Sequence, residues 1–255
     1  MMKLKNSILP MLLGLFGIAF FAACSPDKPE NEKGNKLHED PTKSVFTLTE
    51  GKLRSGTAFG SMPKESDFVP TGNVQKIIWE VVKGENFKTG DGGQTKFVVK
   101  NTKKHPDVVY SLRIDYYNAK GEPMNYQFFD NEQDKIHQHF FTADSLYTQQ
   151  GKVGNNEKTN LILSYTYGDT DPWSQEMGTN GVSWIGKDNP IGFKGYFRFH
   201  KAQKFDLNIR LMHARVSKYS RRNHALSPFY APSPGQLSED AWDLSMRFPI
   251  TVSRQ

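Results

Sequence analysis

The sequence predicts an all-β protein, built as a β-sandwich or as two sandwich-like halves in tandem, with long loops. Short β-prone runs alternate with turn signals along residues 44–255, and no segment keeps a helical apolar stripe beyond a turn or two. Aromatic residues, which favour strands, are plentiful, with 18 Phe, 10 Tyr and 4 Trp. One sandwich or two remain open from these patterns.

Residues 109–117 give the clearest strand pattern. Tyr110, Leu112, Ile114 and Tyr116 fall on one face, which is the period-2 alternation of a half-buried strand. The other predicted strands cover residues 45–48, 76–82, 95–100, 125–129, 136–141, 161–167, 193–200, 205–214 and 244–252.

Turn signals divide these strands. The glycine-rich residues 90–93 predict a hairpin between the strands before and after them, and residues 201–204 predict a second hairpin. The polar, glycine-bearing loop 151–158 is the candidate boundary between two halves.

The N-terminal residues have the features of a leader segment. Lys3 and Lys5 precede an apolar run over residues 8–23, which is short against the roughly 20 residues that span a bilayer. Two alanines then lead into Cys24, the one cysteine of the chain. This stretch resembles the signal peptide of a bacterial lipoprotein, which implies that Cys24 is acylated and becomes the mature N-terminus.

Three parts of the chain follow from this leader. Residues 1–23 are the expected signal peptide, and residues 24–43 are the lipidated cysteine with a charged, proline-bearing, disordered tether. Residues 44–255 are the expected β-rich binding domain. The charged spacer resembles those of Bacteroidota lipoproteins, so we expect an outer-membrane protein anchored by acyl chains, on the periplasmic or the cell-surface face.

Composition narrows the function. The formal net charge is +6, and removal of Lys3 and Lys5 with the leader leaves +4, which gives no support to nucleic-acid binding. Lipidation of Cys24 leaves no thiol for a disulfide. The chain has no G-x-S-x-G elbow, H-E-x-x-H helix or phosphate-binding glycine loop. We therefore expect a binding protein and not an enzyme; a glycan hydrolase that uses two carboxylates distant in the sequence is the enzymatic alternative.

His137 and His139 are the sharpest local signal for a ligand site. Positions i and i+2 of a strand project to the same side, so both imidazoles could meet one transition metal or haem iron. His213, in the apolar phase of its own strand, is the candidate third ligand. The alternative is that the first two histidines face solvent and that His213 is an ordinary buried histidine.

Two further groups are candidate ligand contacts. Arg221 and Arg222 lie in a basic stretch that could hold the carboxylates of haem or a siderophore. Trp173 and Trp184, with Trp242, lie in or beside long loops and could stack on sugar rings. Solvated loop surface and capping of the sandwich ends are the alternatives for these two groups.

Several blocks of the chain resemble a family of Bacteroidota outer-membrane lipoproteins that accompany TonB-dependent uptake. This resemblance implies capture of metal, haem or a metal chelate for a TonB-dependent outer-membrane receptor. A glycan- or protein-binding surface module without metal is the alternative function. The blocks are LHEDP at 37–41, IHQHFF at 136–141, GFKGYFRF at 192–199, FDLNIRLMHARVSKY at 205–219 and SPFYAPSPGQL at 227–237.

Overall fold

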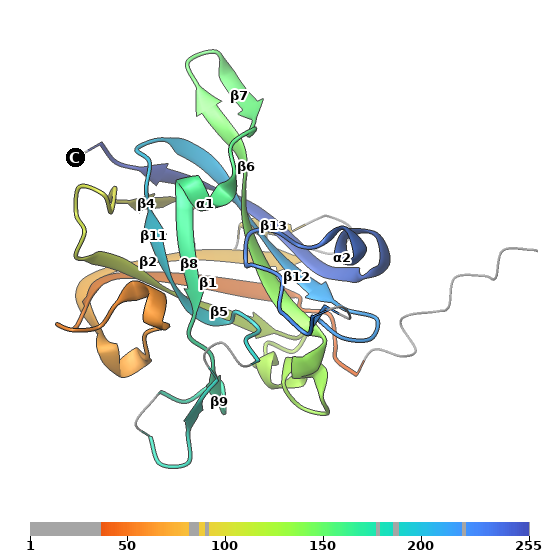
Figure 1. The fold of residues 1–255 in the computed structure, drawn as a ribbon. Helices are drawn as coiled ribbons and strands as arrows, with labels where there is room; N and C mark the ends of the chain where they lie inside the picture. Colours follow the sequence, from red (N-terminus) through yellow and green to blue (C-terminus); the bar gives the residue numbers. More distant parts are fainter. Residues whose placement is uncertain are drawn as a thin grey trace, which may run out of the picture. The chain divides into compact units, whose positions relative to one another are not determined.

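The computed structural model describes residues 37–81, 87–89, 92–176, 179–185, 189–220 and 223–254. These residues belong to one compact unit that begins at Leu37. The unit is mostly β, and two large sheets enclose its core, which confirms the predicted all-β sandwich (Figure 1). The predicted signal peptide and Cys24 lie outside the described residues. No helix in the described part of the chain is long and apolar enough to cross a membrane.

The first sheet has six strands, and every neighbouring pair in it is antiparallel. Its order is β3 (Phe87–Thr89), β2 (Phe68–Val81), β1 (Lys43–Leu53), β5 (Val108–Tyr117), β11 (Lys194–Phe199) and β8 (Leu163–Tyr167).

The second sheet has five strands and is antiparallel except for its parallel β4–β13 pair. Its order is β4 (Phe97–Val99), β13 (Ala241–Val252), β12 (Lys204–His213), β6 (His137–Thr148) and β7 (Gly151–Gly154). A small ribbon pairs β9 (Thr170–Asp171) with β10 (Ser183–Trp184).

The described helices are short. They are α1 (Thr159–Ile162), α2 (Pro234–Glu239) and the 3-10 turns Phe59–Ser61, Glu65–Asp67, Asn125–Phe128 and Gln133–Lys135. The Ser233 hydroxyl accepts the N–H of Gln236 and the Gln236 side chain accepts the N–H of Ser233, a capping box that starts α2 before Pro234.

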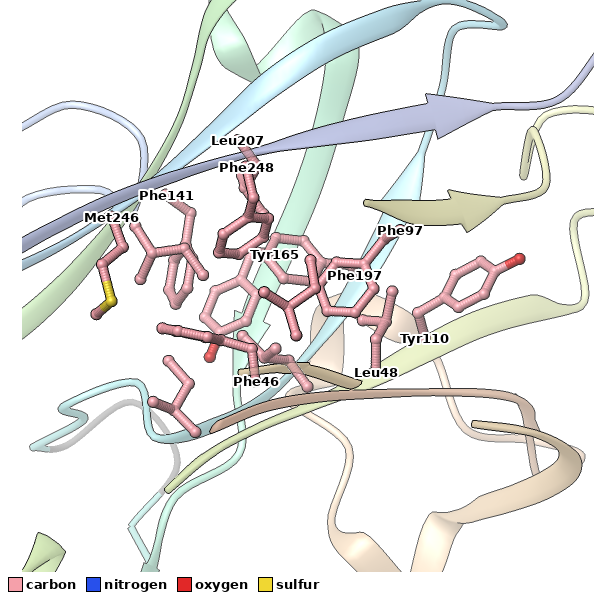
Figure 2. Close-up of a cluster of buried hydrophobic side chains, with 14 of the residues drawn as sticks. Phe46, Leu48, Phe97, Tyr110, Phe141, Tyr165, Phe197, Leu207, Met246 and Phe248 are labelled. Atoms are coloured by element: carbon pink, nitrogen blue, oxygen red, sulfur yellow. The ribbon is translucent and has the colours of Figure 1, made fainter. Parts of the chain in front are cut away.

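The core lies between the two large sheets. The predicted inward face of β5 is buried, since Tyr110, Leu112, Ile114 and Tyr116 are all at most 1% exposed. Phe46 of β1 packs on Phe248 of β13 with ring centroids 5.2 Å apart, so the two sheets meet directly. Figure 2 shows these aromatic side chains filling the space between the sheets.

The hairpin predicted at residues 201–204 is wrong. The strand before this turn, β11, belongs to the six-stranded sheet, while the strand after it, β12, belongs to the five-stranded sheet. The glycine-rich turn fails in the same way, because β2 pairs with β3 while β4 pairs with β13. A turn signal reports that the chain reverses, and it carries no information on which sheet the chain joins next.

Three other segments differ from their expected form. Residues 125–128 form a 3-10 turn instead of a strand. In loop 151–158 the first residues form β7, which pairs with β6 inside the single unit. Residues 37–43, expected in the tether, belong to the domain, because His38 and Pro41 are buried against it. Two buried residues among charged neighbours do not form a hydrophobic pattern that the sequence alone would reveal.

Candidate metal centre

Three side chains converge at one end of the five-stranded sheet. His137 is the first residue of β6, and it lies directly opposite His213, the last residue of β12. Asp243 lies near the start of β13, the strand on the other side of β12. Since these strands are neighbours in the sheet, their hydrogen-bonded register places the three side chains together (Figure 1).

A β-bulge turns Asp243 toward the histidines. Leu211 of β12 pairs with Leu244, but the next residue, Met212, pairs with Trp242, so Asp243 is an extra residue in β13. Such a bulge re-aims a side chain that strict alternation would place on the opposite face. The Asp243 side chain is accordingly only 1% exposed.

The fourth member, His38, comes from the segment that leads into β1 of the other sheet. Its ring packs on Phe128 with centroids 4.5 Å apart, and Phe128 also meets the ring of His137 at 5.1 Å. The cluster of His38, His137, His213 and Asp243 therefore joins both sheets of the sandwich.

The atoms of the cluster have the spacing of metal ligands. Nε2 of His38 lies 3.2 Å from Nε2 of His137 and 3.4 Å from Nδ1 of His213. Oδ2 of Asp243 lies 3.3 Å from His38 Nε2, 3.2 Å from His137 Nε2 and 3.3 Å from His213 Nδ1. All four atoms lie within 4.8 Å of one another.

Five of these separations have the length of an edge of a tetrahedral zinc site. The centre of a regular tetrahedron lies about 0.61 of an edge from each corner, so edges of about 3.3 Å give a centre about 2.0 Å away, the Zn–N and Zn–O bond length. Five of the six edges have this value, and the sixth, between His137 and His213, is at most 4.8 Å.

Hydrogen bonds to backbone carbonyls fix which ring nitrogen of His38 and of His137 points at the cluster. Nδ1 of His137 lies 2.8 Å from the Gln133 carbonyl oxygen, and Nδ1 of His38 lies 3.0 Å from the Glu39 carbonyl oxygen. A carbonyl only accepts, so each Nδ1 donates its proton to that carbonyl, and Nε2 is the nitrogen that each ring directs at the cluster. Donation of the other ring N–H to a carbonyl is the usual arrangement of metal-binding histidines.

Burial shields the cluster from solvent and disfavours a charged ring at His137. The side chains of His38 and His137 are 0% exposed, and that of His213 is 18% exposed. Burial lowers the pKa of His137, against the opposing hydrogen bond to Asp243, and so favours the neutral imidazole that a metal requires. When no ring directs a proton at the cluster, its nitrogen and oxygen lone pairs, 3.2–3.4 Å apart in five of the six pairs, repel one another, and a cation between them removes the repulsion.

His139 is on the same face of β6 as His137 but outside the cluster. Its Nδ1 donates to the Ile191 carbonyl at 3.1 Å, and its Nε2 accepts the Tyr116 hydroxyl at 2.8 Å. Complete burial lowers its pKa to about 3. The i, i+2 spacing thus gave the correct face, but the residue opposite His139 on β12 is Leu211.

The two tryptophans that were predicted to contact a ligand do not join the cluster. Trp173 is 8% exposed and stacks on Phe129 at 6.2 Å, so its ring faces the core and is not presented to a sugar. Trp184, in β10, is half-buried, with the Lys64 ammonium 5.7 Å from its ring. Arg221 and Arg222 lie outside the described residues.

Sequence reasoning missed two members of the cluster. His38 lies in the LHEDP block at residues 37–41, whose composition is that of the tether. Asp243 stands next to Leu244 in an alternating strand, where the pattern places it on the outer face. The signal that could have been used is the presence of His38 in a block that resembles the lipoprotein family.

Comparisons with known proteins do not identify a family: neither the family models, nor the curated proteins, nor the solved structures gave a match to this chain.

Proposed function

We propose that this chain is a lipid-anchored outer-membrane protein that binds a divalent transition metal ion through His38, His137, His213 and Asp243. The observation that carries the proposal is the meeting of three histidine nitrogens and a carboxylate oxygen at ligand spacing. This donor set converges in a buried site formed by four separate segments.

Zinc is the ion that these ligands suit best. Three imidazole nitrogens and one carboxylate oxygen in a tetrahedral arrangement satisfy Zn²⁺. Cu²⁺ and Ni²⁺ prefer square-planar or tetragonal sites, while Mg²⁺ and Ca²⁺ prefer six or more oxygen ligands.

The free ion is a better candidate than haem or a chelate. The four ligand atoms meet at a single point with separations of 3.2–3.4 Å for five pairs. This spacing leaves no room for a porphyrin or a chelating molecule between them. We therefore narrow the expected ligand class to the metal ion alone.

The anchoring half of the proposal rests on the leader and on Cys24. Two or three acyl chains attach a protein durably, and a tethered domain meets a membrane neighbour at high effective concentration. A TonB-dependent receptor is the partner that the resemblance implies. Metabolic labelling with a radioactive fatty acid tests the anchor, because Cys24→Ser should abolish incorporation and release the chain from membranes.

Metal binding is tested with the detergent-solubilised protein after removal of metal by a chelator. Titration with zinc against a chromogenic chelator should show one ion per chain, and His137→Ala or Asp243→Asn should weaken binding by roughly 100-fold or more. His105→Ala, a histidine outside the cluster, is the matched control and should bind like wild type. If the cluster instead shares a proton in an ordinary His–Asp contact, the wild-type chain will bind no zinc in competition, which contradicts the proposal.

A further inference from the structure

The four proposed ligands are held in two different ways. His137, His213 and Asp243 lie on three adjacent strands of the five-stranded sheet, where backbone ladders fix them. His38 belongs to residues 37–42, which precede β1 and which we call the strap. Figure 1 shows the strap, in red-orange, entering β1 beside the end of β12.

The strap is docked by two buried residues, Pro41 at the end that joins β1 and His38 near its start. Leu37, Glu39 and Asp40 are exposed, whereas His38 is only 6% exposed. The Glu39 N–H donates to the side-chain oxygen of the half-buried Gln127 at 2.7 Å. At its far end the strap is continuous with the sheet, since the Thr42 N–H donates to Tyr117 O at 2.9 Å.

The docked ring directs its Nε2 at the other three ligand atoms of the cluster. The Nδ1 proton of His38 is used within the strap, on the Glu39 carbonyl, so only Nε2 faces the sheet. There it meets Nε2 of His137 at 3.2 Å and Oδ2 of Asp243 at 3.3 Å. An ion held at this point would be bound by His38 and by the residues of the sheet together, so the free energy of binding the ion and that of docking the strap are coupled.

Resting on the metal-binding function proposed above, we propose that the strap is a metal-dependent clasp. In the loaded protein His38 closes the coordination sphere. When His38 leaves, the sheet keeps a three-ligand site of His137, His213 and Asp243 with one open position, through which the ion enters, leaves or accepts a ligand from a partner.

The clasp also connects metal occupancy with the membrane attachment. The strap continues directly into residues 24–36, which begin at the proposed lipidated Cys24. Undocking of residues 37–40, which precede the buried Pro41, adds roughly 13 Å to the maximum reach of the chain between anchor and domain. Loss of the ion would thus let the domain extend further from the membrane surface.

Amide hydrogen exchange of the full detergent-solubilised chain tests the clasp. Strap amides in wild type should exchange faster after chelator treatment and slower after zinc is added, while amides of β5 should not change. His38→Ala and the more conservative His38→Gln should still bind zinc, at least tenfold more weakly, with faster release to a chelator and no zinc-dependent protection of the strap. His105→Ala should behave as wild type.

The outcomes separate the two proposals. Zinc binding by wild type without any change in strap exchange overturns the clasp and leaves the metal-binding function standing. Zinc release from His38→Ala at the wild-type rate also overturns the clasp. If wild type binds no zinc, the proposed function fails, and the clasp fails with it.

Discussion

At the scale of single residues, this protein buries ionisable groups at a second place besides the candidate metal centre. The Asp169 carboxylate accepts the backbone N–H groups of Ile191, Gly192 and Lys194 at 2.7–3.0 Å. Lys218, 0% exposed, donates from Nζ to the Pro190 carbonyl at 2.8 Å. Burial lowers the pKa of Lys218 to about 7, although the charges of Asp169 and Asp134 oppose this shift.

The low pKa of Lys218 predicts a pH-dependent stability. Between pH 7 and its ordinary value of 10.5 the unfolded chain binds a proton at Lys218 that the folded chain lacks. The free energy of unfolding should therefore rise with pH in this window, by at most about 1.4 kcal/mol per pH unit.

Lys218→Met removes this group and keeps most of its hydrocarbon. Urea unfolding of wild type and Lys218→Met, both in chelator, should give free energies whose difference shifts in favour of wild type as the pH rises from about 7 to 10. Parallel pH profiles would show that Lys218 is charged in the folded protein throughout this range.

At the scale of elements, alternation predicted which faces are buried, and it failed where the backbone leaves its regular period. The inward residues of β5 were predicted correctly because a half-buried strand repeats every two residues. The same rule placed His137 and His139 on one face. Only the register with β12 separates them, since His213 lies opposite the first and Leu211 opposite the second.

Alternation could not predict two members of the candidate metal centre, Asp243 and His38, and the reasons are physical. The bulge that turns Asp243 inward depends on pairing between β12 and β13, which are separated by the long segment 214–240. His38 docks through one ring in a charged segment, so no local periodicity marks it as buried. Likewise, turn residues indicated reversals at 90–93 and 201–204 but could not show that the chain changes sheets there.

Close packing of β8 on β11 gives a prediction for a single methyl group. A Cβ at Gly195 would lie 2.2 Å from the Tyr165 hydroxyl oxygen and 2.6 Å from the Thr166 carbonyl oxygen. Gly195→Ala should therefore lower the free energy of unfolding by about 1–3 kcal/mol in urea denaturation.

Gly154→Ala on β7 is the matched control, because nothing lies within 4 Å of the position that its added methyl group would take. This variant should stay within about 0.5 kcal/mol of wild type. Equal effects of the two substitutions would contradict the tight contact between β8 and β11.

At the scale of the whole molecule, the candidate metal centre connects the two layers of the sandwich. His38 leads into the six-stranded sheet, while the other three ligands belong to the five-stranded sheet. The chain has one cysteine, so no disulfide bond within the chain can link the two sheets. Metal binding at this place should therefore appear as folding stability.

Zinc should raise the thermal stability of the whole unit. At a free concentration of 100 times Kd, binding to the folded state alone adds about 2.7 kcal/mol, which corresponds to roughly 5–10 °C in Tm for a domain of this size. Scanning calorimetry with zinc and with chelator measures the difference, and His105→Ala should show the same gain as wild type. A gain of equal size in His137→Ala would mean that zinc acts elsewhere on the chain.

The central claim is that His38, His137, His213 and Asp243 hold one metal ion. The most direct measurement is a crystal structure of the zinc-loaded protein, with anomalous diffraction recorded on both sides of the zinc absorption edge. We predict one anomalous peak at the junction of the strap, β6, β12 and β13, with the three nitrogens and the Asp243 oxygen each about 2.0 Å away. A peak bound by other residues, or no peak between these four side chains, would contradict the account.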